Sequence, residues 1–241
     1  MEWTDDAIVL SLRRHGESRF IAELLTRDHG RHMGLVRGLS KKHGNSLQPG
    51  LSVKALWRAR LEDHLGTLQL DPVTSRADLI VGDGLGLLGL SSACAVLGAS
   101  VPEREVHRPL YDAFELLADA FADDEVWPAL YVRWELCLLA ELGFGLELET
   151  CAVSGVTEGL THVSPRTGRA VSEEEAEPYR DRLLKLPRFL GAGGEASPED
   201  VLDGLKLTGH FLEQRIWGLQ GQSAPDARER MVTRLGRQAR A

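Results

Sequence analysis

Residues 20–36 read FIAELLTRDHGRHMGLV, so two apolar runs flank a turn formed by Asp28, His29 and Gly30. Short runs of this kind, bounded by Asp and Gly, are typical of neighbouring β-strands joined by a tight turn. Three further strand-like runs precede Pro72, at residues 7–12, 51–61 and 66–70. Five short strands within roughly the first 70 residues predict a small Greek-key barrel of the OB type.

The apolar period changes from two residues to 3.6 after Pro72, which predicts helices. Helical stripes are expected at residues 105–121, 127–142 and 197–219. The last of these begins with Ser197, a good N-cap, followed by a proline that suits the first helical position. Residues 149–172 interrupt the helical pattern with two short turns, and the arginine-rich residues 225–241 are expected to form an exposed, mobile tail.

The 241 residues include 28 Lys and Arg and 36 Asp and Glu, which gives a formal charge of −8. Residues 1–70 hold 11 basic and 8 acidic residues, a net of +3, whereas residues 71–241 hold 17 and 28, a net of −11. Residues 31–60 contain basic residues and no acid. A basic field on the barrel is one explanation of this asymmetry, and an ordinary solvated face is the other.

Cysteine usage and the N-terminus both bear on the cellular compartment. Cys94, Cys137 and Cys151 are far apart and odd in number, which is typical of a reducing compartment. The acidic N-terminus lacks the basic start and apolar run of a secretory signal. Residues 84–101 carry no charge, but their glycines and the acids that flank them favour a buried helix over a membrane span. We therefore expect a cytoplasmic protein with no membrane partner.

Gly84, Gly86 and Gly89 form a GxGxxG sequence, which in a dinucleotide-binding fold lets the backbone approach a pyrophosphate. A nicotinamide-dependent enzyme that uses residues 84–89 is therefore one alternative. Against it, Asp83 would repel a pyrophosphate, and the helices that follow are not separated by the strands of a parallel sheet. Signatures of serine hydrolases, zinc proteases and P-loop enzymes do not occur in the sequence, so we expect a non-enzymatic binding protein and assign no catalytic residue.

Cys151 begins a segment with the outline of a CxxC zinc knuckle, in which Ser154 replaces the second cysteine. The matching turn at residues 163–169 contains no cysteine, and only His162 offers a second ligand nearby. Zinc requires four N, S or O ligands. We therefore expect no bound metal and no other cofactor.

Binding of single-stranded nucleic acid requires cations that follow the phosphates and aromatic rings on which bases stack. Trp57 and Phe20 are candidate stacking residues, although the core of a small barrel is the favoured place for each of them. Phosphate contacts alone would give salt-sensitive binding without sequence preference. The candidate cations are Arg13, Arg14, Arg19, Arg37, Lys41, Lys42, Arg58 and Arg60.

Short segments in both halves of the chain follow an order and spacing found in a known family. In the first half these segments are residues 14–17, 20–30, 35–39 and 47–50. In the second half they are residues 131–136 and 142–145, then Cys151, Gly155 and residues 163–171. Together they resemble the RecO family of bacterial recombination mediators. The resemblance covers nearly the whole chain and depends on the order of several weak motifs.

The resemblance implies an α+β fold whose domains follow one another along the chain. An N-terminal five-stranded OB-type barrel is expected at residues 1–75, and a mainly α-helical domain at residues 76–150 and 173–224. A small insertion is expected at residues 151–172, before the flexible basic tail at residues 225–241. In some members of the family the insertion is a four-cysteine zinc finger. Because only Cys151 remains here, we expect a degenerate, metal-free, zinc-finger-like insertion.

The resemblance also implies a function in DNA repair and recombination. Family members bind single- and double-stranded DNA and anneal complementary strands. They engage single-stranded DNA-binding protein and work with RecR to load RecA. Such a protein would be cytoplasmic and associated with the nucleoid. A protein-only adaptor, whose barrel no longer binds DNA, is a further alternative for this chain.

The tail of bacterial single-stranded DNA-binding protein is acidic and ends in an apolar residue and a carboxylate. A receptor for it should therefore pair a cation with an apolar groove. Arg133 lies about one helical turn from Leu130 and next to Trp134, so these three residues are the candidate tail-binding site. The alternative is an arginine whose stem covers the helix and whose head meets an acid.

Overall fold

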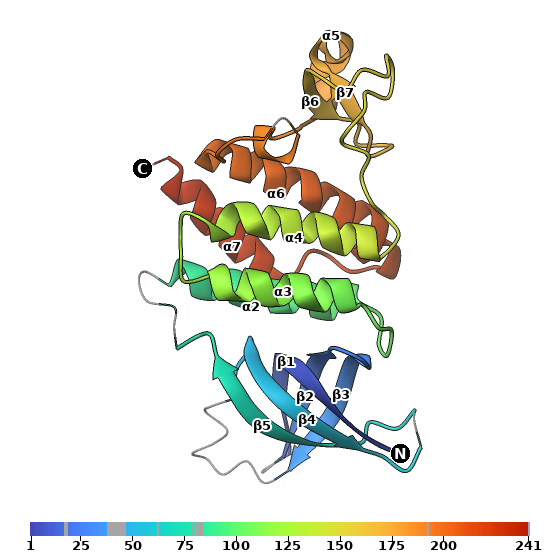
Figure 1. The fold of residues 1–241 in the computed structure, drawn as a ribbon, viewed down its shortest axis with the longest axis vertical. Helices are drawn as coiled ribbons and strands as arrows, with labels where there is room; N and C mark the ends of the chain where they lie inside the picture. The colour runs from blue at the N-terminus through green and yellow to red at the C-terminus, as the bar shows by residue number, and fades with distance from the viewer. Residues whose placement is uncertain are drawn as a thin grey trace. The chain divides into compact units, whose positions relative to one another are not determined.

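Figure 1 shows the computed structural model of the chain, which describes residues 1–16, 19–37, 47–61, 63–78, 80, 84–191 and 193–240. The chain forms two compact units, Met1–Asp123 and Asp124–Ala241. The first unit contains a β-barrel followed by two helices, and the second contains further helices and a small sheet. The α+β class and the order of barrel before helices are confirmed.

The barrel consists of the five strands that the sequence predicts. They are β1 (Glu2–His15), β2 (Arg19–Thr26), β3 (Gly30–Arg37), β4 (Leu51–Arg58) and β5 (Thr67–Ser75). They close in the order β1-β2-β3-β5-β4, and all neighbours are antiparallel except β3 and β5. β1 is longer than predicted because its first half pairs with β4 and its second half with β2. An irregularity between Val9 and Ser11 marks the change of partner, where a bulge lets the strand bend around the barrel.

Two helices complete the first unit, α2 (Leu85–Ser100) and α3 (Arg108–Ala120). α2 packs against the chain that leads into β4, since a Cβ on Gly50 would lie 2.6 Å from the side chain of Leu90. Arg76, at the end of the barrel, is 7% exposed and binds Asp119 of α3 at 2.6 Å. The uncharged residues 84–101 thus form a buried helix, as predicted. Within the described residues, no helix has the length and apolarity needed to cross a membrane.

The second unit is built on α4 (Trp127–Glu141), α6 (Pro198–Leu212) and α7 (Asp226–Gln238). The predicted start of α6 is confirmed by a capping box: Ser197 Oγ accepts from the Asp200 amide at 3.1 Å, and Asp200 accepts from the Ser197 amide at 3.2 Å. Beyond α6 the chain continues through a π-helical turn, η3 (Glu213–Trp217), and a 3₁₀ turn, η4 (Gly218–Gln220).

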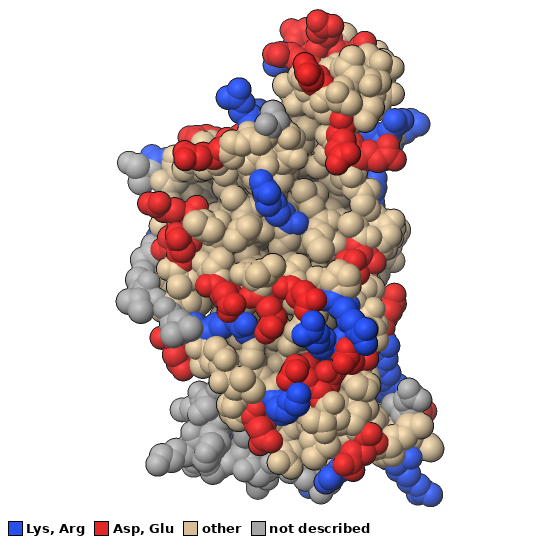
Figure 2. Space-filling view, in the orientation of Figure 1, with Lys and Arg blue, Asp and Glu red and all other residues tan. Residues whose placement is uncertain are grey.

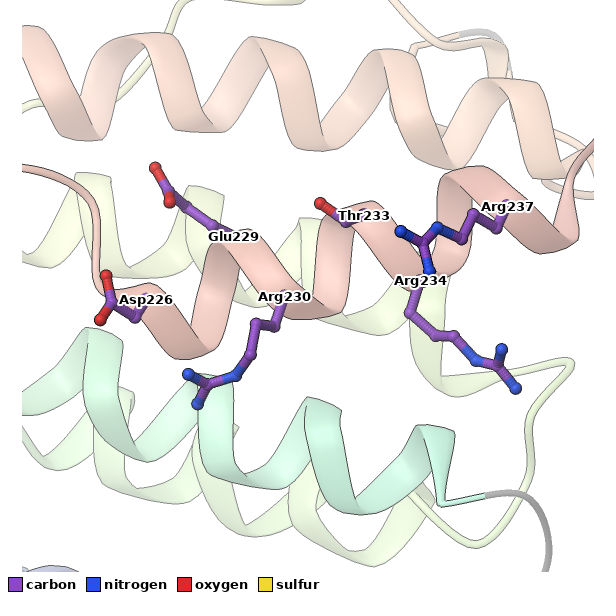
Figure 3. Close-up of a pocket in the computed structure, with 6 residues that line it drawn as sticks. All are labelled: Asp226, Glu229, Arg230, Thr233, Arg234 and Arg237. Atoms are coloured by element: carbon purple, nitrogen blue, oxygen red, sulfur yellow. The ribbon is translucent and has the colours of Figure 1, made fainter.

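Residues 225–241 were expected to form a mobile tail, but the structure places Asp226–Gln238 in the helix α7. Met231 is fully buried, and Arg228 binds the buried carboxylate of Glu135 on α4. Arg230, Arg234 and Arg237 project from the exposed part of the same helix (Figure 3). The apolar residues of α7 recur at a helical period among the arginines, and this buried face is what orders the segment.

The insertion between α4 and α6 contains a three-stranded sheet in the order β7-β6-β8. Its elements are β6 (Leu160–Val163), β7 (Ala170–Ser172), α5 (Glu173–Ala176), η1 (Glu177–Arg182), β8 (Leu184–Lys185) and η2 (Arg188–Leu190). Cys151, Val171 and Ala176 form its small core. Because β8 pairs with β6, the insertion extends beyond residue 172, which was its predicted end.

Candidate nucleic-acid interface

One end of the barrel gathers most of the predicted cations that the structure describes. In the hairpin of β1 and β2, His15 is the register partner of Arg19. In the next hairpin, Arg19 is the register partner of Arg37. These three residues form a row across three strands, and Arg13 and Arg14 precede its first member. Because facing residues of antiparallel strands are about 5 Å apart, the basic groups share a small area.

The two arginines of β1 are both exposed. Successive side chains of a strand point to opposite faces, so Arg13 and Arg14 present charge on both sides of the hairpin end. For Arg37 only the backbone position is described. The predicted Lys41 and Lys42 lie outside the described residues. This group of Arg13, Arg14, Arg19 and Arg37 is called the basic end below.

Arg58 and Arg60 are not part of the basic end. Arg58 pairs in register with Glu2 at the start of β1 and binds it through two hydrogen bonds, Nε to Oε2 at 2.7 Å and Nη2 to Oε1 at 3.1 Å. Hydrogen bonding to Glu2 raises the pKa of Arg58. Much of the charge of Arg58 is therefore locally balanced, while Arg60 lies exposed two residues farther along.

The two candidate stacking residues, Trp57 and Phe20, are buried or half-buried in the barrel. Trp57 is 1% exposed and donates from Nε1 to the carbonyl oxygen of Leu65 at 3.2 Å, so its ring belongs to the core. Phe20 is half-buried on β2. Aromatic residues that the sequence did not single out, Trp3 and His29, lie instead at the mouth of the barrel, where their rings stack.

The candidate tail-binding residues separate into two environments on α4. Trp134 is 3% exposed and belongs to the core, whereas Leu130 is 36% exposed and Arg133 is exposed beside it. Arg133 donates from Nη2 to the carbonyl oxygen of Phe189 at 2.7 Å, and its guanidinium lies 5.8 Å from the centre of the Phe189 ring. The arginine head therefore meets a carbonyl and an aromatic ring rather than an acid.

Charges of both signs are interspersed over the barrel on the face drawn in Figure 2. Acidic side chains gather over α5, which carries Glu173, Glu174 and Glu175 in its first turn. The excess of acid predicted for residues 71–241 is thus visible on the insertion. Strand register brings four of the predicted cations, Arg13, Arg14, Arg19 and Arg37, together at the basic end.

Comparison with known proteins identifies the family. A family model described as "Recombination protein O N terminal" matches residues 1–76, and one described as "Recombination protein O C terminal" matches residues 81–220. The chain is 52% identical over 237 residues to the DNA repair protein RecO of Rhodospirillum centenum, covering 97% of this chain and 94% of that protein. It is 47% identical over 239 residues to the RecO of Methylobacterium nodulans, covering 96% and 97%. The chain belongs to the RecO family. This family acts in DNA repair and recombination.

The degenerate knuckle of this RecO-family chain is organised around the sulfur of Cys151. Burial by itself raises the pKa of the thiol, but hydrogen bonds from Ser154 and Ser172 outweigh it and lower the pKa from 9.0 to about 6. The amide of Ser172 donates to the sulfur at 3.3 Å. Among the residues that the structure describes, no group of three His, Cys, Asp or Glu side chains could hold a metal ion. A metal-free, zinc-finger-like insertion stays a prediction.

The GxGxxG sequence has a packing role in this RecO-family fold. A Cβ on Gly86 would lie 2.1 Å from the carbonyl oxygen of Phe121, so glycine permits the close approach of α2 to the end of α3. Gly89 is buried on the same helix. Among the described strands only β3 and β5 pair in parallel, so the described sheets do not have the parallel arrangement of a dinucleotide-binding fold.

Proposed function

We propose that this RecO-family chain binds single- and double-stranded DNA with the basic end of its barrel and anneals complementary strands. The observation that carries the proposal is the cross-strand row of Arg19 and Arg37 beside Arg13 and Arg14. Clustered cations on an OB-type barrel suit the phosphate backbone, and contacts to phosphate do not depend on sequence. Lys41 and Lys42, which follow Arg37 closely in the chain but lie outside the described residues, are proposed to contribute to the same binding.

Salt titration of DNA binding tests this proposal. For single-stranded DNA each phosphate contact contributes about 0.7 to the slope of log affinity against log salt. Reversing the charge of both Arg13 and Arg14 to Glu should lower affinity more than about tenfold and reduce the slope by about 1.4. The double reversal of Lys41 and Lys42 should act in the same direction.

A matched control uses two exposed cations of the second unit, Arg166 and Lys206. Their double reversal to Glu changes the net charge equally and should leave the slope unchanged. If all three double variants reduce the affinity and the salt slope equally, binding depends on net charge rather than on the basic end. No binding of any oligonucleotide at low salt, with partner binding intact, would instead favour the protein-only adaptor.

We further propose that Leu130 and Arg133 receive the tail of single-stranded DNA-binding protein. An exposed apolar side chain beside a cation fits an acidic peptide that ends in an apolar residue and a carboxylate. Arg133→Ala should lose affinity for the tail peptide while keeping DNA binding and its salt slope. Loss of both activities together would indicate misfolding, and retention of peptide binding would refute the assignment.

The proposed cellular role is recombination mediation. With RecR, the chain would load RecA onto DNA coated by single-stranded DNA-binding protein, acting as a binding protein rather than an enzyme at the nucleoid. Its family membership supports this role. RecA filament formation on coated DNA should require this chain together with RecR, and Arg133→Ala should slow it only when the DNA is coated. An equal defect on bare DNA would contradict the role of the tail contact.

A further inference from the structure

A pocket of about 370 Å³ opens at the mouth of the barrel, and the residues that line it do not include any assigned above to phosphate or partner binding. Strand ends of the barrel and the segment between α2 and α3 enclose it. Its walls include Trp3, His29, His32, Trp57, Arg104 and Val106. All of them belong to the first unit. Barrel mouths are common ligand sites, and the volume is in the range of small-molecule pockets.

Aromatic rings form the inner wall of this mouth pocket. The ring of Trp3 stacks on His29 with centroids 4.3 Å apart and on Trp57 with centroids 5.5 Å apart. His32 meets Trp3 and Trp57 edge-on, and burial lowers the pKa of His32, which keeps its ring neutral near pH 7. The side chain of His29 is 34% exposed, so an occupant can reach it.

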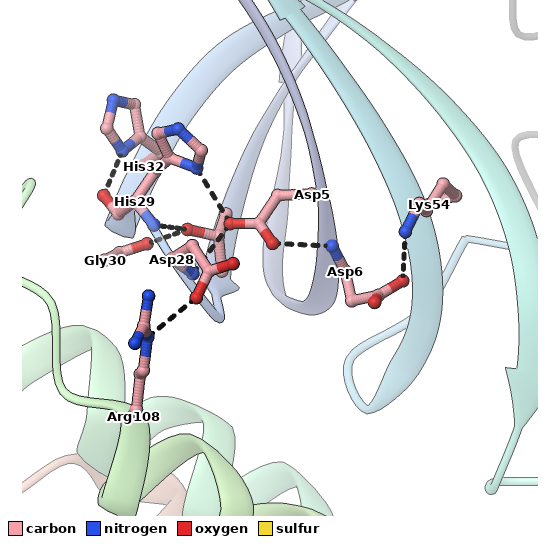
Figure 4. Close-up of polar contacts among 9 residues, drawn as sticks. Asp5, Asp6, Asp28, His29, Gly30, His32, Lys54 and Arg108 are labelled. Carbon is pink, nitrogen blue, oxygen red and sulfur yellow. Dashed lines mark hydrogen bonds and ion pairs between the residues drawn. The ribbon is translucent and has the colours of Figure 1, made fainter.

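A buried carboxylate fixes the position of the His29 ring. Its Nδ1 lies 2.9 Å from Oδ2 of Asp5, a buried carboxylate, as Figure 4 shows. Asp5 also accepts from the amides of Asp6 and Asp28, both at 2.8 Å. The imidazole is thus oriented by a carboxylate that is itself fixed by backbone amides.

The acids at the pocket rim already have partners. Glu2 binds Arg58, and Asp28 binds Arg108 of α3 at 2.8 Å (Figure 4). Arg104, in contrast, is exposed, and its guanidinium donates to the backbone carbonyl of His64 at 3.5 Å, with no ion pair to an acid among the described residues. An anionic group of an occupant would therefore meet a cation at this rim rather than an unpaired carboxylate.

Arg104 is also conformationally unusual. It is the non-glycine residue with positive φ, +63°, among those described. Its amide donates to the carbonyl oxygen of Arg31 at 2.8 Å, which ties the strained residue to β3. A left-handed backbone is unfavourable for arginine, and residues strained in this way concentrate at ligand sites.

We propose that the mouth pocket takes one unstacked base of single-stranded DNA, with Arg104 contacting the adjoining phosphate. The inference rests on the proposed DNA-binding function and names a base-binding subsite for it. The loop between β4 and β5, whose carbonyls at His64 and Leu65 bind Arg104 and Trp57, is a loop that OB folds use for oligonucleotides. Flat aromatic walls suit a base, and stacking is available only when the base has left a duplex.

The test compares oligothymidylate with a deoxyribose-phosphate oligomer of the same length that lacks bases. The wild-type protein should bind oligothymidylate roughly 5- to 150-fold more tightly, from one base contact. His29→Ala should bring this ratio close to one without changing the salt slope, because no phosphate contact is lost. Arg104→Ala should instead reduce the slope by about 0.7.

Two further variants serve as controls for misfolding. His29→Phe restores a flat ring and should restore most of the ratio. Tyr179→Ala removes an exposed aromatic ring of the second unit that does not line the pocket and should keep the ratio of the wild type. An unchanged ratio in His29→Ala, or equal wild-type affinity for the two oligomers, would overturn the pocket while leaving phosphate binding by the basic end intact. Failure of the wild type to bind either oligomer at low salt would refute the proposed function itself.

Discussion

Arg228→Met would remove the cation from an ion pair that has almost no contact with water. Glu135 is fully buried, and the side chain of Arg228 is 8% exposed. Two hydrogen bonds join them, Nε to Oε1 at 2.6 Å and Nη2 to Oε2 at 2.8 Å. Thr208 of α6 donates to the same carboxylate, so α4, α6 and α7 meet there. Burial opposes the charge of Arg228, but the carboxylate of Glu135 outweighs it and raises the pKa of Arg228.

The expected loss of stability follows from this burial. Removing one partner of a buried pair leaves an uncompensated charge and costs about 3–5 kcal/mol. Urea unfolding, followed by circular dichroism and tryptophan fluorescence, measures the free energy of unfolding. With a slope near 2 kcal/mol per molar urea, the midpoint for the second unit should fall by about 1.5–2.5 M.

Two comparisons make the result interpretable. Arg230→Met changes an exposed arginine of the same helix and should alter stability by less than about 0.5 kcal/mol. The double variant Glu135→Leu with Arg228→Met removes both charges and should recover most of the loss, because the Thr208 hydroxyl can then donate to the carbonyl oxygen of Gly204, 3.1 Å away. If Arg228→Met unfolds within about 1 kcal/mol of the wild type, α7 is the mobile tail that the sequence suggested, and the reasoning fails.

Three further predictions concern the insertion and the packing of α2. The pKa of Cys151 is lower in the folded state, about 6, than in the unfolded chain, so the folded state binds fewer protons. The melting temperature of the wild type minus that of Cys151→Ser should therefore increase from pH 6 to pH 9. A difference that stays constant over this range would contradict the low pKa. Gly86→Ala should destabilise by about 1–3 kcal/mol in urea unfolding because its Cβ meets a backbone carbonyl, whereas Gly145→Ala, whose Cβ would have 3.6 Å of space, should not. Elemental analysis of the purified protein should find no stoichiometric zinc, and about one zinc per chain would overturn the metal-free insertion.

The strands and helices were largely predictable from local patterns. Residues 20–26 and 32–36 lie in β2 and β3, and the capping pair at Ser197 starts α6 where expected. The start of β1 was missed because Asp5 interrupts the apolar pattern. That carboxylate is buried and accepts amide hydrogen bonds, one of them from Asp28 in the turn between β2 and β3, so a polar residue is accommodated inside a strand.

The site was predictable only in part. The position of Arg13 and Arg14 next to a hairpin end was predictable, because both the cations and the turn are visible in the sequence, and their role in binding stays a prediction. Their convergence with Arg37 required the strand register. Trp57 lies in the core, the place that the sequence favoured for it, whereas its contact with the ring of Trp3 was not predicted.

The fold class and the order of the domains were predictable because they depend on interactions between residues a few places apart in the chain. Such interactions produce an apolar period or a capping pair that is visible in the sequence. Contacts between distant residues are a different matter. Trp3 meets Trp57 because the barrel closes β1 onto β4, and Arg228 enters the core because Glu135 is buried there and requires a cation. Barrel closure and the desolvation of a carboxylate are properties of the folded chain, so neither produces a repeating signal in the sequence.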